Sequence, residues 1–196
     1  MEQHLHLQPP RPQRRPVPAP AKPHPSVAAA SHPALSPFIV RVDALLKSRP
    51  LREVPEAVAG LLAGLARVEG LLAPHQRRPG DDGYRRHLLH RDPRGRYTLM
   101  ALVWRPGQGT PVHGHSAWCS VAVHTGHPTV ARYDYEPGYG ALPTGAHCCY
   151  PGEVAWEQPG VSRPHRIYNA ARDVAITLHC YGRDLASDPC AINLPV

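Results

Sequence analysis

Two histidines separated by one residue are the chemically most informative feature of the chain. His113 and His115 lie in the segment 107–126, which reads GQGTPVHGHSAWCSVAVHTG. Side chains two positions apart on a β-strand point to the same face. Two imidazoles on one face can bind the same metal ion. The spacing therefore predicts a metal site at the start of a strand-like apolar run.

A second group of chemically active side chains follows an alternating pattern near the end of the chain. Thr177, His179 and Tyr181 occupy every second position of the segment TLHCYG. On a strand they share one face, so a hydroxyl, an imidazole and a phenol lie in a row. Such a row can relay hydrogen bonds, select one tautomer of the histidine and present the phenol to a metal pocket.

These motifs together resemble those of a known enzyme family. The glycine-framed histidine pair resembles the first motif of the cupin barrels, in which the position of Cys119 is normally a glutamate metal ligand. His165 in HRIYN matches the H-x-x-x-N of the second cupin motif. A cysteine in place of the glutamate, followed by Thr-x-His-x-Tyr, is similar to the thiol dioxygenases of the cysteine dioxygenase type. The resemblance covers residues 84–185.

The resemblance implies a metal site with three histidine ligands, His113, His115 and His165, and Fe(II) as cofactor. Three neutral imidazoles leave other positions on a divalent first-row metal open for chemistry. Without a carboxylate ligand the metal keeps more positive charge, which favours an anionic thiolate as a further ligand. Zn²⁺ also accepts three histidines and a water, so the residues alone leave zinc as an alternative.

The resemblance also assigns roles to the remaining residues of the predicted site. It implies that Cys119 and Tyr181 can be joined by a thioether bond, and that His179 and Thr177 support the tyrosine. An arginine two residues after a tyrosine, here Arg86 after Tyr84, binds the carboxylate of cysteine in this family. A planar guanidinium suits bidentate binding of a carboxylate. The expected reaction is the oxidation of L-cysteine by O₂ to cysteine sulfinic acid.

Several alternatives stay open at this point. Relatives that prefer 3-mercaptopropionate carry glutamine at the position of Arg86, but a shift of one residue would place Arg85 inside instead. Gly182 to Asp184 departs from the Ser-Pro-Pro turn of the animal enzymes, and Arg163 could bind a carboxylate of its own. The same barrel can also host a non-catalytic metal-binding protein, or a zinc- or manganese-dependent isomerase or hydrolase.

The composition favours a single cytoplasmic enzyme domain. The 196 residues carry a net charge of +7, but the basic residues are scattered arginines, so we expect no nucleic-acid partner. Five cysteines without regular spacing argue against a disulfide framework and for a reducing compartment. No apolar run is long enough to span a membrane, and no protein partner is inferred. The expected partners are a small thiol and O₂.

Changes in periodicity along the chain predict its organisation. Residues 1–33 are rich in proline and are expected to form a disordered tail, while 34–196 form one domain. Within it, 34–75 should form a helical cap, with a helix from Ser36 and Pro37 and a second over 55–73. Short apolar runs over 84–185 predict strands. The predicted fold is mostly β, a single jelly-roll-like cupin barrel with this helical cap.

Overall fold

The computed structural model describes residues 32–185 and 192–196, so most of the predicted tail lies outside the described residues. Two helices precede a series of strands, and two 3-10 turns lie at Leu51–Glu53 and Pro74–Arg77. The helices are α1 (Leu35–Ser48) and α2 (Val54–Ala66). The strands of the described residues are β1 (Arg85–Arg91), β2 (Thr98–Trp104), β3 (His113–His115), β4 (Cys119–Thr125), β5 (Thr129–Glu136), β6 (Gly140–Cys148), β7 (Val154–Glu157), β8 (Gly160–Tyr168), β9 (Ala175–Tyr181) and β10 (Asn193–Pro195).

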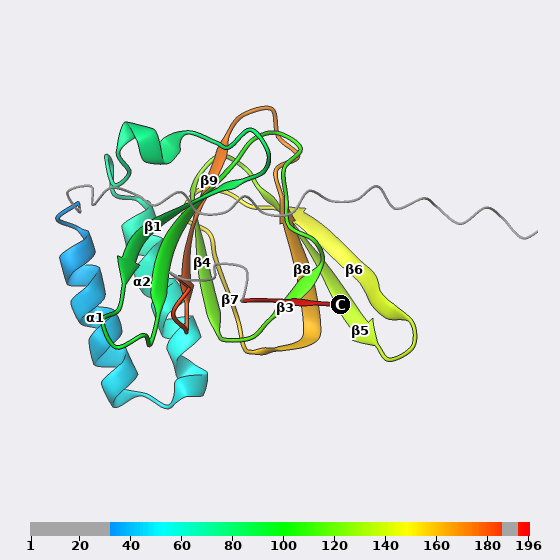
Figure 1. The fold of residues 1–196 in the computed structure, drawn as a ribbon, viewed down its shortest axis with the longest axis horizontal. Coiled ribbons are helices and arrows are strands. Elements are labelled where there is room, and N and C mark those ends of the chain that lie inside the picture. Colours follow the sequence, from blue (N-terminus) through cyan, green and yellow to red (C-terminus); the bar gives the residue numbers. More distant parts are fainter. Residues whose placement is uncertain (1–31, 186–191) are drawn as a thin grey trace, which may run out of the picture.

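The strands form two antiparallel sheets that face each other (Figure 1). The first sheet has the order β1-β2-β9-β4-β7 and the second the order β10-β3-β8-β5-β6. Apart from the consecutive pairs β1–β2 and β5–β6, neighbours in each sheet come from distant parts of the sequence, which is the connectivity of a double-sheet jelly roll, the architecture that cupins share. The predicted fold class is therefore confirmed. Within the described residues no strand pairing joins the two sheets, so the jelly roll is open and not a closed barrel.

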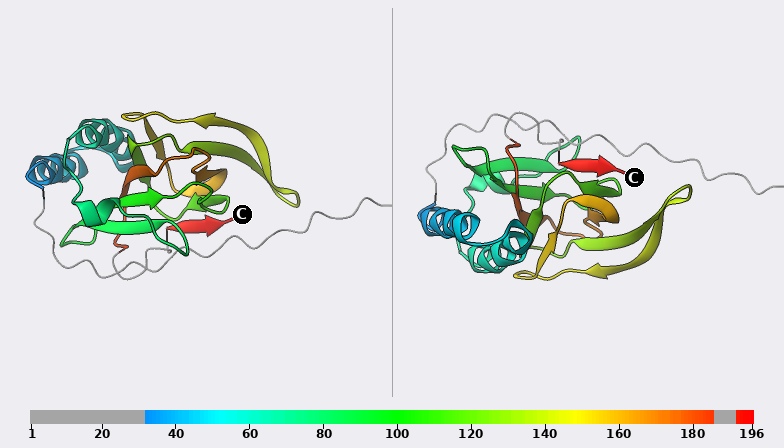
Figure 2. Two further views of the ribbon diagram at one scale, coloured as in Figure 1. Left: turned by 90° about the horizontal axis from the view of Figure 1, so that it is seen from above. Right: turned by 90° about the horizontal axis from the view of Figure 1, so that it is seen from below.

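Both helices cover the outer face of the first sheet, and the β5–β6 hairpin extends beyond the sheets (Figure 2). In α1, Leu35, Phe38 and Val42 are buried at helical spacing. The helix begins at Leu35, one residue before the predicted cap at Ser36, and Pro37 lies in its first turn, where its missing N–H costs nothing.

The second helix ends earlier than the sequence predicts. It stops at Ala66 and not at Ala73, and the left-handed Gly70, with a φ of 70°, lies in the turn that follows. Leu71 and Leu72 lie beyond the helix and are nevertheless buried in the cluster under the helices. Of the predicted apolar stripe, Val58, Leu62, Leu65 and Leu72 are buried, whereas Leu61 and Val68 are only partly buried, and the helix is shorter than predicted.

Strand β9 at the centre of the first sheet contributes to two different cores. All seven of its residues are buried. Ile176, Leu178 and Cys180 belong to the apolar cluster under the helices. Thr177 and Tyr181 alternate with them and point between the two sheets, as strand geometry requires. The helical layer therefore gives a rigid backing to a face that carries polar groups.

The histidine pair lies on a different strand from the apolar run that follows it. His113–His115 form the short strand β3 of the second sheet, whereas Cys119 begins β4 of the first sheet. The expectation that the pair starts the apolar strand was therefore wrong. Residues 116–118 cross from one sheet to the other, which brings the histidines of one sheet opposite the cysteine of the other.

Candidate functional site

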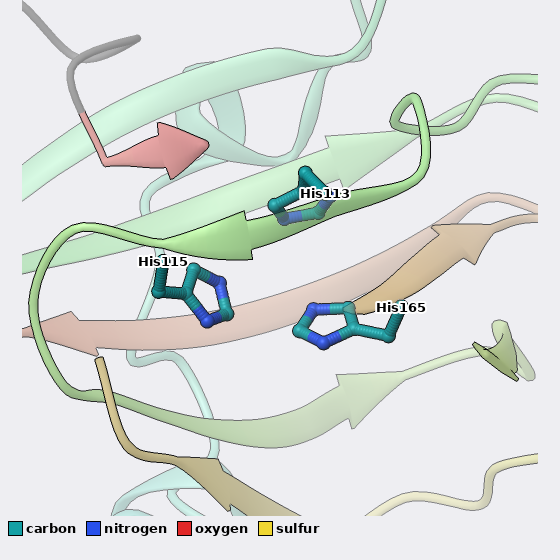
Figure 3. Close-up of side chains that lie close together, drawn as sticks. All are labelled: His113, His115 and His165. Carbon is teal, nitrogen blue, oxygen red and sulfur yellow. The ribbon is translucent and has the colours of Figure 1, made fainter. Parts of the chain in front are cut away.

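The three predicted ligand histidines gather between the two sheets. His113 and His115 come from β3, and His165 comes from β8, where it is the direct register partner of His113. Their potential ligand atoms all lie within 4.8 Å of one another, and all three side chains are buried. The rings face one another in Figure 3, with centroids 4.7 Å to 5.1 Å apart. We call this group the histidine cluster.

Glycine between the two histidines allows β3 to pack closely against β8. A Cβ atom at Gly114 would lie 2.2 Å from the carbonyl oxygen of Gly160, far below any van der Waals contact. The carbonyl oxygen of Gly160 is a backbone atom and cannot move aside as a flexible side chain would. A side chain at this position would push β3 away from β8 and separate His113 from His165. The motif His-Gly-His thus has a steric reason in addition to its ligand spacing.

Burial keeps the imidazoles of the histidine cluster neutral. Desolvation is the main cause that lowers the pKa of His115 to about 3 and the pKa of His165 well below its usual value. It also lowers the pKa of His113, whose Nδ1 lies 3.0 Å from the carbonyl oxygen of Pro111. A carbonyl only accepts, so Nδ1–H donates and the lone pair of His113 is on Nε2. Three neutral nitrogen donors in a buried cluster fit a divalent first-row metal, zinc and iron alike.

The predicted relay is connected by hydrogen bonds. Thr177 Oγ1 lies 2.8 Å from His179 Nε2, and Tyr181 Oη lies 2.9 Å from His179 Nδ1. The indole of Trp104 donates to Thr177 Oγ1 over 2.9 Å. Because burial lowers the pKa of His179 well below its usual value, this ring is neutral and carries one proton. Thr177, His179 and Tyr181 form the relay from here on.

Each of the two tautomers of His179 gives the relay one direction of hydrogen bonding. With the proton on Nε2, this nitrogen donates to Thr177 Oγ1 and the O–H of Tyr181 donates to Nδ1. With the proton on Nδ1, Thr177 donates to Nε2, as its contact from the donor Trp104 Nε1–H allows, and Nδ1–H donates to Tyr181 Oη. In this arrangement the O–H of Tyr181 is directed away from the relay and toward the space between the sheets.

Arg86 reaches the same space from the first strand. It is 4% exposed, and its Nη2 donates to Tyr84 Oη over 2.5 Å. The ring of Tyr84 stacks on Trp104 with centroids 4.2 Å apart. Arg86 is the register partner of Leu102, and both line one small cavity with the histidine cluster. Arg85 points to the opposite face, so the register places Arg86 inside.

Cys119 lies directly opposite Tyr181 across the pair β4–β9. Residues paired in this way have Cβ atoms about 4.5–5.5 Å apart on one face of the sheet. Cys119 is 2% exposed, and its burial raises the pKa of its thiol well above the usual value. The sulfur is therefore a neutral thiol beside the phenol ring of Tyr181.

Two charged residues at the site were missed by the sequence analysis. Glu157 of β7 is the register partner of Cys119 on the side away from Tyr181. Its Oε1 accepts a hydrogen bond from Arg132 Nη1 at 2.7 Å and lies 4.0 Å from His165 Nδ1. Neither residue stands in a recognisable motif. Trp104 was also missed, although its alternation with Leu102 in the run TLMALVW indicates that it points inward.

Three hollows meet around these residues. A cavity of about 10 Å³, enough for a single water molecule, lies between the histidine cluster, Arg86 and Tyr181. A cavity of about 90 Å³ extends from His115 and His165 between β4, β5, β7 and β8. An outer groove of about 190 Å³ is lined by polar side chains, among them the exposed Arg163. Arg163 thus lies at the groove and not beside Arg86.

The other cysteines have different surroundings. Cys180 is buried under the helices, Cys149 is buried at the far end of the 90 Å³ cavity, and Cys148 is exposed. Cys190 lies outside the described residues. The four cysteines of the described part are free thiols.

In the described part of the chain, neither α-helix is long and apolar enough to cross a membrane.

Fold and site together define a double-sheet jelly-roll protein with a buried three-histidine cluster that can hold a metal ion. No protein-family model matches the chain. Similar solved structures include the protein TT1209 from Thermus thermophilus, with 19% identity and a TM-score of 0.43 over 56% of this chain and 92% of that one.

Two further solved structures show a similar degree of likeness. A Cupin 2 conserved barrel domain protein from Salinispora arenicola has 16% identity and a TM-score of 0.41, over 56% of this chain and 83% of that one. An uncharacterized conserved protein with a double-stranded β-helix domain from Klebsiella pneumoniae has 18% identity and a TM-score of 0.43, over 61% of this chain and 95% of that one. The function of this chain has to be argued from its own residues.

Proposed function

We propose that this protein is an iron-dependent thiol dioxygenase that converts L-cysteine to cysteine sulfinic acid. The reaction adds both atoms of O₂ to the sulfur of a thiol RSH and gives RSO₂H, so all atoms balance. One observation carries the proposal: the histidine cluster, Arg86 and Tyr181 line one small cavity, with a cysteine and no carboxylate at the cupin glutamate position. Bound Fe(II) would supply the redox chemistry and the site at which the thiolate and O₂ meet.

Arg86 would hold the carboxylate of the substrate. Its guanidinium is buried and lies over the Tyr84 ring at 4.8 Å, and the stack on Trp104 supports that ring from behind. A charge-assisted pair between a guanidinium and a carboxylate contributes on the order of 1.5–3 kcal/mol. The cavity as it stands has room for one water molecule, so its lining side chains must move before a thiol binds. The buried guanidinium supports a thiol that carries a carboxylate.

Tyr181 would orient the reacting groups through its hydroxyl. Its phenol lines the cavity, and burial raises the pKa of Tyr181 well above its usual value, so the phenol keeps its proton. With His179 protonated on Nδ1, the O–H of Tyr181 is free to donate into the cavity. A protonated phenol can donate a hydrogen bond to a thiolate or to an oxygen atom. The contribution of the chain is mainly positioning, because its groups are buried and held by hydrogen bonds before the substrate binds.

The resemblance further implies a thioether bond between Cys119 and Tyr181. Their direct register pairing supports this bond, since the sulfur stands beside the ring that it would join. Forming the bond removes one hydrogen from the thiol and one from the ring, and O₂ accepts both together with their electrons. Intact-mass measurement after turnover should show the loss of two hydrogen atoms, and a Cys119→Ala variant should show none.

The nearest alternative substrate is 3-mercaptopropionate, which has the same carboxylate and thiol but no amine. The assignment of cysteine and not of this compound rests on the family resemblance at Arg86 alone, because a guanidinium binds either carboxylate equally well. The free thiols of the described residues support a cytoplasmic location, where such small thiols are kept reduced. The proposed partners are the small thiol and O₂, with no nucleic acid, membrane or protein partner.

The experiment that tests the proposal is oxygen uptake by anaerobically iron-loaded protein. L-cysteine, 3-mercaptopropionate and cysteamine are compared at equal concentration, and the product is identified by mass. Uptake with L-cysteine and a gain of two oxygen atoms is the expected result. Uptake with 3-mercaptopropionate alone would keep the dioxygenase and change its substrate. Bound metal without uptake for any thiol would instead identify a metal-binding protein or a redox-inert enzyme. Zinc-loaded protein is the matched inactive control.

A further inference from the structure

A cavity between the two sheets adjoins the histidine cluster and has a volume of about 90 Å³. Small aliphatic side chains from four strands form its inner wall: Val121, Val123, Val130, Ala155 and Ile167. Toward solvent its wall also contains polar and exposed side chains, among them Arg132, His147, Glu153 and Glu157. We call this space the apolar cavity.

The apolar cavity lies next to the small cavity at the proposed substrate site. His115, His165 and Cys119 line both spaces. Arg86 and Tyr181 line only the small cavity, whereas Val130 and Ala155 line only the apolar one. The histidine cluster is therefore approached from two sides that differ in chemistry, one with a cation and a phenol, the other with aliphatic walls.

The register of the first sheet explains this division. Across the pair β4–β9, Tyr181 faces Cys119, His179 faces Val121 and Thr177 faces Val123. The polar side chains thus stay on β9, and β4 contributes aliphatic side chains along the same inner face. The second sheet completes the wall with Ile167 of β8 and its register partner Val130 of β5.

The aliphatic inner wall limits which ligand this part of the cavity can accept. A carboxylate or an ammonium group would lose its hydration there without gaining partners along the inner wall, and Arg132 and Glu157 at the edge are paired with each other. An apolar cavity of comparable size stays dry and binds small apolar molecules such as xenon. Dioxygen is uncharged, is a very weak hydrogen-bond acceptor and moves favourably from water into apolar surroundings. Of the two reactants of the proposed reaction, only dioxygen matches these walls.

An ion pair bounds the apolar cavity on its outer side. Arg132 and Glu157, joined at 2.7 Å, line both this cavity and the polar outer groove. The pair is partly shielded, with side chains 34% and 17% exposed. The pair lies between the aliphatic inner wall and the groove, and the exposed Val154 and Trp156 line the cavity as well.

We propose that the apolar cavity holds dioxygen beside the histidine cluster, so that the gas and the thiol reach the cluster from opposite sides. This inference rests on the proposed dioxygenase function and adds the place at which its second substrate is held. It predicts that changes to the cavity walls alter the dependence of the rate on oxygen and leave the dependence on thiol unchanged.

A binding measurement tests the cavity without any turnover. Crystals of the iron-free protein are exposed to xenon under pressure, and anomalous scattering locates the gas. Xenon is expected in contact with Val121, Val130 and Ile167. The same crystals of a Val130→Phe variant should contain no xenon there, because the larger ring fills the space. Absence of xenon from the wild-type cavity would overturn the proposal.

Steady-state kinetics then test the role of dioxygen. In Val130→Phe the KM for O₂ should rise about tenfold, and the KM for the thiol should stay within about twofold of the wild-type value. The graded variant Val130→Ile, which adds less volume, should show a smaller rise in the same constant. Val40→Phe makes the same change at a side chain that is 67% exposed on α1, and it should alter neither constant. Iron content and near-ultraviolet circular dichroism verify that each variant is folded.

The possible results separate this inference from the proposed function. Oxygen uptake by the wild-type protein with at least one thiol tests the dioxygenase alone. If that uptake is normal and Val130→Phe and Val130→Ile both keep the wild-type KM for O₂, only the apolar cavity proposal fails. A rise confined to the KM for the thiol would also overturn it, because the cavity would then hold the substrate chain. If the wild-type protein consumes no oxygen, the proposed function fails and the assignment of dioxygen falls with it.

Discussion

The two faces of the first sheet are made by the same strands and have opposite chemistry. On the outer face, Ile176 and Leu178 pack under the helices in an apolar cluster. On the inner face, one residue further along the same strand, Thr177 and His179 form the relay beside the histidine cluster. The outer face derives its stability from apolar area, whereas the inner face is held by directed hydrogen bonds.

The difference shows how a small protein can bury polar groups near its centre. Each polar side chain of the relay has a hydrogen-bond partner within 3 Å, including the anchor from Trp104. Buried polar groups cost free energy when they lack partners, and these have them. The outer face supplies the hydrophobic stabilisation that allows the inner face to be specialised. Substitutions on the outer face should therefore mainly lower stability, whereas substitutions on the inner face should mainly affect metal binding and turnover.

The largest expected effect is the loss of metal binding on the inner face. His165→Ala removes one of three ligands, and the two remaining imidazoles cannot retain the ion. Metal content after iron loading and desalting should fall from near one ion per chain to near zero, and turnover should disappear with it. Elemental analysis measures the first and oxygen uptake the second.

A matched histidine elsewhere provides the control for this experiment. His127 is exposed in the turn before β5, and His127→Ala should retain both metal and turnover. Retention of iron and normal turnover in His165→Ala would remove this residue from the ligand set.

An outer-face substitution should act on stability without removing the site. Leu178 is fully buried under the helices, and Leu178→Ala removes its contacts there. The free energy of unfolding should fall by about 2–5 kcal/mol, the range for leucine truncations in cores. Chemical denaturation measures the loss, and the folded fraction should bind metal as the wild-type protein does. A fully stable variant that loses metal would contradict the division between the two faces.

Charge on the inner face should control the choice of substrate. Arg86→Gln keeps a polar side chain but loses the cation, so L-cysteine turnover should drop by the equivalent of about 1.5–3 kcal/mol in kcat/KM. By the family resemblance, turnover of 3-mercaptopropionate should drop less, since relatives that prefer this thiol carry glutamine at the position of Arg86. The rates of both thiols are compared under saturating oxygen.

The neighbouring arginine is the natural control for Arg86. Arg85 points to the other face of the same strand, and Arg85→Gln should change neither rate. An equal loss for both thiols in Arg86→Gln would leave the residue as a carboxylate binder with no part in specificity.

The inner face was largely predictable because its residues follow the two-residue repeat of a strand. The alternation of Thr177, His179 and Tyr181 places them on one face whatever the rest of the fold does. The spacing of Arg86 from Tyr84 places these two on one face in the same way, but only the register of β1 with β2 shows that this face, and not that of Arg85, points inward. This two-residue alternation depends only on neighbouring positions along one strand, so it can be recognised in a single sequence.

The parts that were missed depend on which strands become neighbours. The position of Glu157 beside Cys119 comes from the pairing of β4 with β7, and Arg132 enters through β5 of the opposite sheet. The crossing between β3 and β4 was missed because His113–His115 is only three residues long and carries no apolar alternation. Strand β6 is mostly exposed and lacks an apolar repeat as well. These features follow from tertiary pairing, which no local pattern records.

The most gradual effect should be the response of the metal-free protein to acid. Burial lowers the pKa of His115 from 6.5 to about 3, and it also lowers that of His179. The unfolded chain, whose histidines titrate near 6.5, therefore binds more protons than the folded one below that pH. The free energy of unfolding must fall as the pH decreases from about 6.5 toward 3, by about 1.4 kcal/mol per pH unit for each such group.

Removing one buried imidazole should flatten this dependence. In metal-free His179→Gln, denaturation between about pH 6 and pH 5 should show a slope that is smaller by about 1.4 kcal/mol per pH unit. An exposed-site variant, His127→Ala, should keep the wild-type slope. The comparison distinguishes the two faces of the sheet once more. In Leu178→Ala the free energy of unfolding should fall by the same amount at every pH, so its slope against pH should not change. An unchanged slope in His179→Gln would mean that this imidazole binds its proton as readily in the folded protein as in the unfolded chain. The imidazole would then become exposed to water in acid before the outer face unfolds.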